Sequence, residues 1–274
     1  NFYKLAGQTD LYFEYATNEK VALEVAAAAA IAGMRAMCSM KHVGLNVAAD
    51  PLNTLSYTGV KAGMVIVTAD DPSMHSSQNE QDNRYYAKLS LIPMVEPADP
   101  AEALEFTRRA FALSEELQMP VLLRTTTRVN HSRGVCTLGE LTPRRFVGHF
   151  DKDFRRWVPV PAVARQLRLK LINKQDQAYL AMQKLGLDVK EGEGELGIIT
   201  AGVAYAYVKE VLIELGMEGR VQLLKIGSIH PLPRRQIRDL LASTRRVLVV
   251  EELEPYLETE IRALAQRAGV STLI

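Results

Sequence analysis

Short apolar runs alternate with segments whose apolar residues recur at helical spacing over the first half of the chain. The run Met64–Ala69 is almost wholly apolar, as is typical of a parallel strand buried on both faces. The pattern predicts strands at Leu11–Tyr15, Ala36–Met40, Met64–Ala69, Pro93–Glu96 and Pro120–Arg124. It predicts helices at Glu19–Gly33, Gly44–Tyr57 with a kink or restart at Pro51, Tyr85–Leu91 and Pro100–Leu117.

The alternation stops at about Val129 and resumes near Glu195. A long helix is predicted at Ala162–Leu185, and a charged, glycine-containing joint follows it. Beyond the joint the pattern predicts strands at Leu196–Ala201, Val221–Ile226 and Val247–Glu251, helices at Ala204–Leu215, Arg234–Leu241 and Pro255–Arg267, and the start of a strand at Leu273. We therefore expect an α/β protein with two doubly wound parallel-sheet domains, at residues 1–150 and 195–274, joined by a crossover linker with a helix at 151–194.

Composition narrows the classes of partner and compartment. The chain has 274 residues and a net charge of +1, which gives no support for binding to nucleic acid or to an anionic membrane. No apolar run approaches the roughly 20 residues of a membrane span, and no signal peptide is expected. Cys38 and Cys136 are too few and too far apart for a disulfide framework or a cysteine metal cluster. These features favour a reducing compartment, and we expect the cytoplasm.

The start of the helix predicted from Glu19 is the first candidate for chemistry. Thr17 or Asn18 can cap the helix, and Glu19 then lies in its first turn, where the helix dipole favours a carboxylate. The helix is rich in Ala and Val, which predicts close packing and burial. A carboxylate at the edge of such an apolar layer lies where open α/β sheets bind ligands. The alternative is that Glu19 only starts the helix.

A long polar segment follows the buried strand Met64–Ala69. It runs from Asp70 to Arg84, and a loop of this length in a compact domain usually binds something or is mobile. Arg84 is its only Lys or Arg, and a guanidinium is suited to binding a carboxylate through two hydrogen bonds. The loop lacks the acidic spacing of a calcium site. A solvated loop without a ligand is the alternative.

Other strand ends carry weaker signals. His42 follows the strand Ala36–Met40 and is either an acid or base or a hydrogen-bonded loop histidine. Gly202 lies between a strand and a helix but lacks the three-glycine spacing of a dinucleotide site. The acidic segment Glu251–Glu254 fits a ligand contact or a docking edge. A basic edge, which suits an anionic ligand or a domain contact, is formed by Arg124, Arg128, His131 and Arg133.

Several longer motifs resemble a known family. They are the segment 17–24 (TNEKVALE), the segment 40–48 (MKHVGLNVA), the segment 70–82 (DDPSMHSSQNEQD), the segment 126–134 (TTRVNHSRG) and the segment 249–255 (VVEELEP). Together they are similar to the large (alpha) subunit of indolepyruvate ferredoxin oxidoreductases, within the thiamine diphosphate-dependent 2-oxoacid:ferredoxin oxidoreductases. The resemblance extends over essentially the whole chain.

The resemblance implies domain identities and site residues. Residues 1–150 would be a pyrimidine-binding domain without its N-terminal part, and residues 195–274 a transketolase C-terminal-like domain. Glu19 would hydrogen-bond the aminopyrimidine ring of thiamine diphosphate and so assist proton transfer within the cofactor, with Gly44 also in the cofactor site. Arg84 would contact the substrate carboxylate, and the further substrate contacts expected on position are His42, Gln78 and Asn79.

The family reaction is the oxidative decarboxylation of an arylpyruvate with coenzyme A, which yields an aryl-acetyl-CoA, CO2 and reduced ferredoxin. It implies thiamine diphosphate, Mg2+ and [4Fe–4S] clusters. Each such cluster uses four thiolates, and this sequence has only two cysteines. We therefore expect segments absent from this sequence to hold the magnesium and the clusters. The implied partners are a smaller beta subunit and ferredoxin, in a dimer of heterodimers.

Three alternatives remain open from the sequence. The chain could be a non-catalytic docking or structural fragment. It could belong to a 2-oxoacid:ferredoxin oxidoreductase with a different substrate. A nucleotide-dependent transferase or dehydrogenase is suggested only by the two α/β units, and the lack of a complete phosphate-binding glycine motif argues against it.

Overall fold

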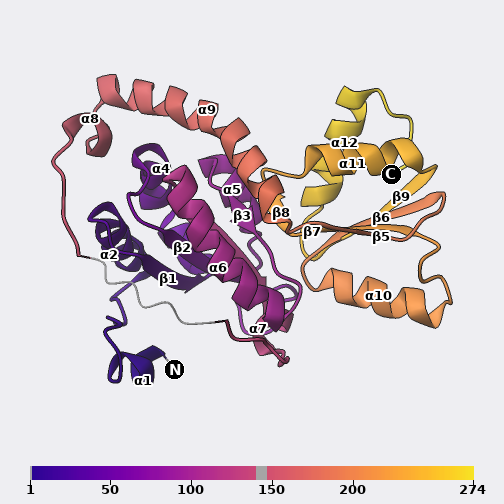
Figure 1. Cartoon of the computed structure of the whole chain (residues 1–274), viewed down its shortest axis with the longest axis horizontal. Helices are drawn as coiled ribbons and strands as arrows, with labels where there is room; N and C mark the ends of the chain where they lie inside the picture. Colours follow the sequence, from indigo (N-terminus) through magenta and orange to yellow (C-terminus); the bar gives the residue numbers. More distant parts are fainter. Residues whose placement is uncertain (1, 140–146) are drawn as a thin grey trace.

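Two sheets lie next to each other in the computed structural model, which describes residues 2–139 and 147–274 (Figure 1). The first sheet has the order β1-β2-β4-β3-β8 and the second β5-β7-β6-β9. The first contains β1 (Ala36–Lys41), β2 (Met64–Asp70), β4 (Val121–Thr126), β3 (Met94–Val95) and β8 (Ser228–His230). The second contains β5 (Val189–Glu191), β7 (Gln222–Ile226), β6 (Leu196–Ala201) and β9 (Arg246–Val250). All pairings are parallel except those of β8 with β3 and of β5 with β7, at one edge of each sheet.

Helices cover both faces of the first sheet because its strands are apolar on both faces. Met64 and Ile66 pack in a cluster with Leu23, whereas Val65 packs in a separate cluster with Leu113. The helices on the first face are α2 (Glu19–Ile31), α3 (His42–Val47), α4 (Ala49–Thr58) and α5 (Arg84–Ser90). Those on the opposite face are α6 (Pro100–Leu117) and the long α9 (Pro161–Leu185), which leads into the second sheet.

The second sheet is covered in the same way. Val208 of α10 (Ala204–Glu214) packs on one face, and residues of α11 (Arg234–Ser243) and α12 (Tyr256–Ala268) pack on the other. One buried cluster contains Met94 of the first sheet together with Ile226 and Tyr256 of the second unit. The two units therefore share a continuous apolar core. None of the helices in the part of the chain that the structure describes is long and apolar enough to cross a membrane.

Most predicted elements are confirmed within two residues. The helix Pro100–Leu117 has the predicted bounds, because the Asp99 side chain accepts a hydrogen bond from the Glu102 N–H at 2.8 Å and Pro100 begins the helix. The α/β class with parallel sheets is confirmed as well. The division at residues 150 and 195 stays a prediction, and β8 from beyond residue 195 pairs with the first sheet.

One local prediction is wrong. Leu11–Tyr15 forms no strand, because it has no neighbouring strand to pair with, and Tyr12 and Tyr15 are exposed. The kink or restart expected at Pro51 is a restart: α3 ends at Val47 and α4 begins at Ala49, so Pro51 falls in the first turn of α4, where no N–H is needed. Leu273 makes a single parallel bridge to Arg246. The elements not predicted are α1 (Phe2–Ala6), α7 (Thr127–His131), α8 (Phe154–Trp157), β5 and β8.

Candidate functional site

Glu19 and Gly44 lie against each other at the start of α2. Asn18 is the N-cap, since its Oδ1 accepts a hydrogen bond from the Val21 N–H at 3.0 Å. Glu19 is half-buried, and a Cβ on Gly44 would lie 2.5 Å from its Cγ and 3.0 Å from its Oε1. Only glycine leaves room for the Glu19 side chain here. The structure therefore brings together the two residues expected in the cofactor site and fixes the carboxylate beside α3.

His42 begins α3 and is fully buried beneath the polar loop Asp71–Asn83. Its Nε2 lies 3.1 Å from the carbonyl oxygen of Asn79, while its Nδ1 has no hydrogen-bond partner among the described residues. Lys41 Nζ donates to the Ser76 carbonyl at 2.9 Å. The end of β1 thus holds the loop through its backbone. The side chains of Gln78 and Asn79 remain exposed.

Asp71 organises the same loop from the end of β2. It accepts hydrogen bonds from the Ser76 N–H at 2.9 Å, from Ser77 Oγ at 2.5 Å and from Thr127 Oγ1 at 2.7 Å. Burial favours protonation, but these hydrogen bonds outweigh it and hold the pKa of Asp71 well below its usual range. The loop is therefore closed around a carboxylate that accepts hydrogen bonds within the chain.

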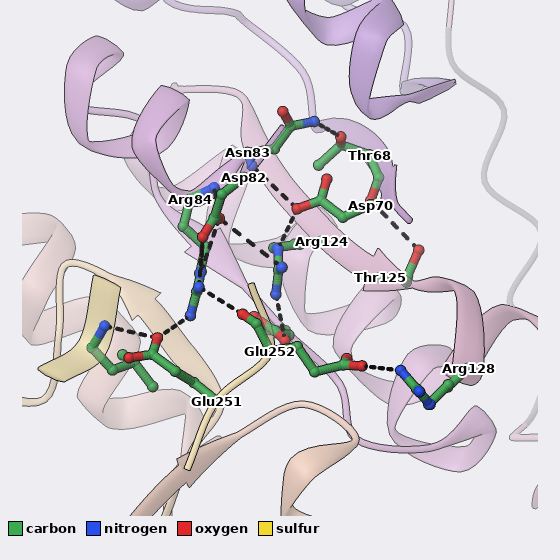
Figure 2. Close-up of polar contacts among 12 residues, drawn as sticks. Thr68, Asp70, Asp82, Asn83, Arg84, Arg124, Thr125, Arg128, Glu251 and Glu252 are labelled. Carbon is green, nitrogen blue, oxygen red and sulfur yellow. Dashed lines mark hydrogen bonds and ion pairs between the residues drawn. The ribbon is translucent and has the colours of Figure 1, made fainter. Parts of the chain in front are cut away.

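Arg84 lies in a buried ion-pair network between the two sheets (Figure 2). Its Nε and Nη2 donate to Asp82, and its Nη1 donates to Glu251. Nη2 also donates to the carbonyls of Glu252 and Glu254, at 2.8 and 2.9 Å. Each of its three guanidinium nitrogens has a protein acceptor, and 1% of the side chain is exposed. The structure places Arg84 away from open surface, so the expected substrate contact would require these bonds to break.

Arg124 is the second cation of this network. Its Nε lies 2.7 Å from Asp70 Oδ2, and its Nη1 lies 2.7 Å from Glu96 Oε1. Burial raises the pKa of both carboxyls against the attraction of Arg124. Two guanidiniums thus face the carboxyls of Asp70, Asp82, Glu96 and Glu251 at the junction of the sheets.

Gly202 packs against this network instead of opening a ligand crevice. A Cβ at Gly202 would overlap Oε1 of Glu96, and its φ is +55°. A diphosphate at this turn would meet a carboxylate, so the structure argues against the dinucleotide interpretation of this segment. The carboxyl edge of the second sheet is closed against the first.

Arg128, His131 and Arg133 of the basic edge are exposed, whereas Arg124 is buried, and Arg128 is the one of the three that follows β4 most closely. It lies in α7, directly after β4, and 40% of its side chain is exposed. Its Nη1 lies 2.7 Å from Glu252 Oε1, and no contact of its Nε or Nη2 is recorded within residues 2–139 and 147–274. The sequence predicted Arg128 only as one member of a basic edge. Its burial relative to Arg124 could not be read from the sequence.

Comparison with known proteins supports the resemblance. No family model matches the chain. It is 50% identical over 267 residues to indolepyruvate oxidoreductase subunit IorA of Methanothermobacter thermautotrophicus, a match over 96% of this chain and 43% of that protein. The subunit of Methanothermobacter marburgensis is 48% identical over 270 residues, 97% of this chain and 43% of that protein.

A solved structure has the same fold. A 2-oxoglutarate:ferredoxin oxidoreductase from Magnetococcus marinus matches with a TM-score of 0.66 at 17% identity, over 90% of this chain and 51% of that one. This chain spans less than half the length of the curated relatives that it matches. Over nearly all of its own length, it is related in sequence to part of indolepyruvate oxidoreductase subunit IorA and shares the fold of 2-oxoacid:ferredoxin oxidoreductases.

Proposed function

We propose that the chain is part of an arylpyruvate:ferredoxin oxidoreductase, which converts an arylpyruvate such as indolepyruvate and coenzyme A into an aryl-acetyl-CoA, CO2 and reduced ferredoxin. The observation that carries the proposal is the placement of Glu19 at the start of α2, held against Gly44. The identity to indolepyruvate oxidoreductase subunits supports the substrate class. The proposal includes a pyrimidine-binding domain at 1–150, a linker at 151–194 and a transketolase C-terminal-like domain at 195–274.

Glu19 and Gly44 fit the aminopyrimidine end of thiamine diphosphate. Asn18, not Glu19, caps the helix, and the described residues give the half-buried Glu19 carboxylate no hydrogen bond, so it can accept or share a proton with a ring nitrogen. The missing side chain at Gly44 leaves the space that the Glu19 side chain occupies. When bound, thiamine diphosphate supplies the electron sink that decarboxylation requires. Glu19 would hold a proton at the ring nitrogen, which is acid–base work for a fixed carboxylate.

The cysteines do not fit iron–sulfur clusters. Cys38 lies buried in β1, where burial raises the pKa of its thiol to about 12, and Cys136 is on a distant segment. Among the described residues, no three His, Cys, Asp or Glu side chains gather to hold a metal ion. The proposal assigns the [4Fe–4S] clusters and Mg2+ to other parts of the complete enzyme. That enzyme would include the beta subunit, form a dimer of heterodimers, reduce ferredoxin and lie in the cytoplasm.

The substrate contacts we propose lie along the carboxyl edge of the first sheet. The His42 ring is fully buried there, with an Nδ1 that has no hydrogen-bond partner among the described residues, and the side chains of Gln78 and Asn79 are exposed on the loop above it. For the substrate carboxylate we propose Arg128 in place of Arg84, because Arg128 follows β4 directly, is exposed, and has no contact of its Nε or Nη2 among the described residues. A guanidinium binds a carboxylate with paired hydrogen bonds.

The first test replaces Glu19 by Gln in the complete enzyme. We expect loss of at least 100-fold in arylpyruvate-dependent ferredoxin reduction, because removal of a positioned acid–base group typically costs about 10²–10⁴-fold. Thermal unfolding should be unchanged. Glu24→Gln is the matched control, since Glu24 lies on the same helix and is exposed. Near-normal turnover in Glu19→Gln would refute the proposal, and 2-oxoglutarate in the same assay tests the other substrate class.

A further inference from the structure

The turn that follows β9 is held in place by one buried arginine. We call residues Glu251–Glu254 the β9 turn. Arg84 donates to the side chain of Glu251 and to the carbonyls of Glu252 and Glu254. Leu253, between those carbonyls, has a φ of +70°, in the left-handed region that a leucine rarely adopts. The contacts to Arg84 therefore keep the turn in a conformation that its own sequence does not favour.

The β9 turn carries Glu252 to the edge of the first sheet. Its Oε1 accepts a hydrogen bond from Arg128 Nη1 at 2.7 Å, and its Oε2 is buried without a hydrogen-bond partner among the described residues. Glu252 is the more buried partner, with 13% of its side chain exposed against 40% for Arg128. Figure 2 shows the two side chains joined by this contact, in which Glu252 is the more buried and therefore the more restricted member.

We propose that Glu252 is a positioning residue, which holds the Arg128 guanidinium so that its free Nε and Nη2 edge meets the carboxylate of a 2-oxoacid. The inference rests on the proposed function, which assigns that carboxylate to Arg128. The Nε–H and Nη2–H groups form a planar fork that matches a carboxylate, and a guanidinium already held by Nη1 loses less freedom when it binds. The C-terminal unit then contributes a residue to a site built mainly by the first sheet.

A contrary role must be separated from this one. A carboxylate beside Arg128 could also compete with the substrate for the guanidinium. Glu252→Gln keeps an oxygen acceptor at the same reach and removes the charge. Glu252→Asp keeps the charge and shortens the reach by one methylene group. The two variants therefore distinguish a Glu252 that positions Arg128 from a Glu252 that competes with the substrate for Arg128.

The experiment uses the complete enzyme with its partner subunit. We measure KM and kcat for an arylpyruvate, and the inhibition constants of 3-phenylpropionate and of its uncharged amide. For Glu252→Asp we expect KM and the inhibition constant of the acid to rise about three- to fivefold, the size typical of a partly exposed ion pair, with the amide unchanged. Glu252→Gln should stay within twofold of wild type. Glu254→Gln is the control, because its side chain is exposed and its carbonyl to Arg84 is kept.

Four results would overturn the inference. Tighter binding of the acid by Glu252→Gln would show that Glu252 competes with the substrate. Equal weakening of acid and amide by Glu252→Asp would show a general distortion of the site. If the inhibition constant of the acid is unchanged in Glu252→Asp but rises in Arg128→Ala, Arg128 remains the proposed carboxylate contact and the positioning role of Glu252 is refuted. Unchanged acid binding in Arg128→Ala would remove both assignments, whereas the proposed function itself is judged by Glu19→Gln.

Discussion

At the scale of single residues, Gly44 is the most constrained position near the candidate cofactor site. Because Gly44 has no side chain, Glu19 packs against α3 in the space that a Cβ would occupy. The sequence could predict Glu19 as a helix start, because a cap and an acidic first turn have a recognisable pattern. It could not predict the contact with Gly44 from spacing, since that contact depends on how α2 and α3 pack.

Replacement of Gly44 by Ala should displace the Glu19 carboxylate. The new methyl group would lie 2.5 Å from Glu19 Cγ, so the side chain must turn away. We expect loss of about tenfold or more in turnover in the complete enzyme, since a small misplacement of a catalytic group is costly. Activity at saturating thiamine diphosphate is the measurement. Gly186→Ala is not a suitable control, because nothing lies within 4 Å of a Cβ at Gly186 and its φ is positive. Ala48→Gly, on the same segment as Gly44, is the control for local stability. Wild-type activity in Gly44→Ala would contradict the geometry.

His230 gives a residue-scale prediction for pH. Burial lowers the pKa of His230 to about 4, from about 6.5 when unfolded. Between those values the unfolded chain binds more protons, so stability rises with pH from about 4 to about 6.5 and is lost on acidification through that range. His230→Gln should flatten this dependence in thermal unfolding scans from pH 4.5 to 7. His131→Gln, on an exposed residue, should leave it as in wild type, and equal slopes in both variants would contradict the assignment.

At the scale of elements, periodicity predicted the buried strands and the amphipathic helices because burial on the sheet enforces their patterns. The helix Pro100–Leu117 carries its cap, its first-turn proline and its apolar stripe in the sequence itself. Leu11–Tyr15 has strand-like residues but no partner, and a strand exists only by pairing. The strands β5 and β8 are three residues long, too short for an alternating hydrophobic pattern to be recognised, and they exist because they pair with β7 and β3.

The loop after β2 depends on one carboxylate. Asp71 accepts hydrogen bonds from residues 75–77 and from Thr127. We expect Asp71→Ala to open the loop, because the released N–H and hydroxyl groups have no other acceptor at hand. Limited proteolysis should then cut between residues 73 and 80 several times faster than in wild type. Asp50→Ala, at an exposed helix start, is the control, and equal cleavage rates would contradict the role of Asp71.

At the scale of the whole molecule, the junction between the sheets depends on ion pairs that residue order could not reveal. The sequence predicts Arg84 as a substrate contact at the end of a polar loop, yet its partners at 251–254 lie far along the chain. Only the fold brings them together. The same is true of Arg124 and Arg128, which are neighbours in sequence and differ in burial.

Loss of Arg84 should destabilise the junction strongly. Arg84→Ala leaves the buried carboxyls of Asp82 and Glu251 without their guanidinium, which typically costs about 3–5 kcal/mol. Lys88→Ala is the matched control, because Lys88 lies on the same helix and pairs with Glu260 of α12 at the surface. That change should cost about 1 kcal/mol or less. Denaturant unfolding of both variants is the measurement, and similar losses would contradict a special role for the buried pair.

The strand β8 links the parts of the chain in a way that a domain boundary drawn from sequence does not show. It comes from the second unit and closes the edge of the first sheet beside β3. A fragment cut before residue 195 would leave that edge unpaired, with hydrogen-bonding groups open to another chain. The boundary between the two units is therefore not a clean place for recombination, because an exchange of either half would have to supply a strand equivalent to β8 for the first sheet.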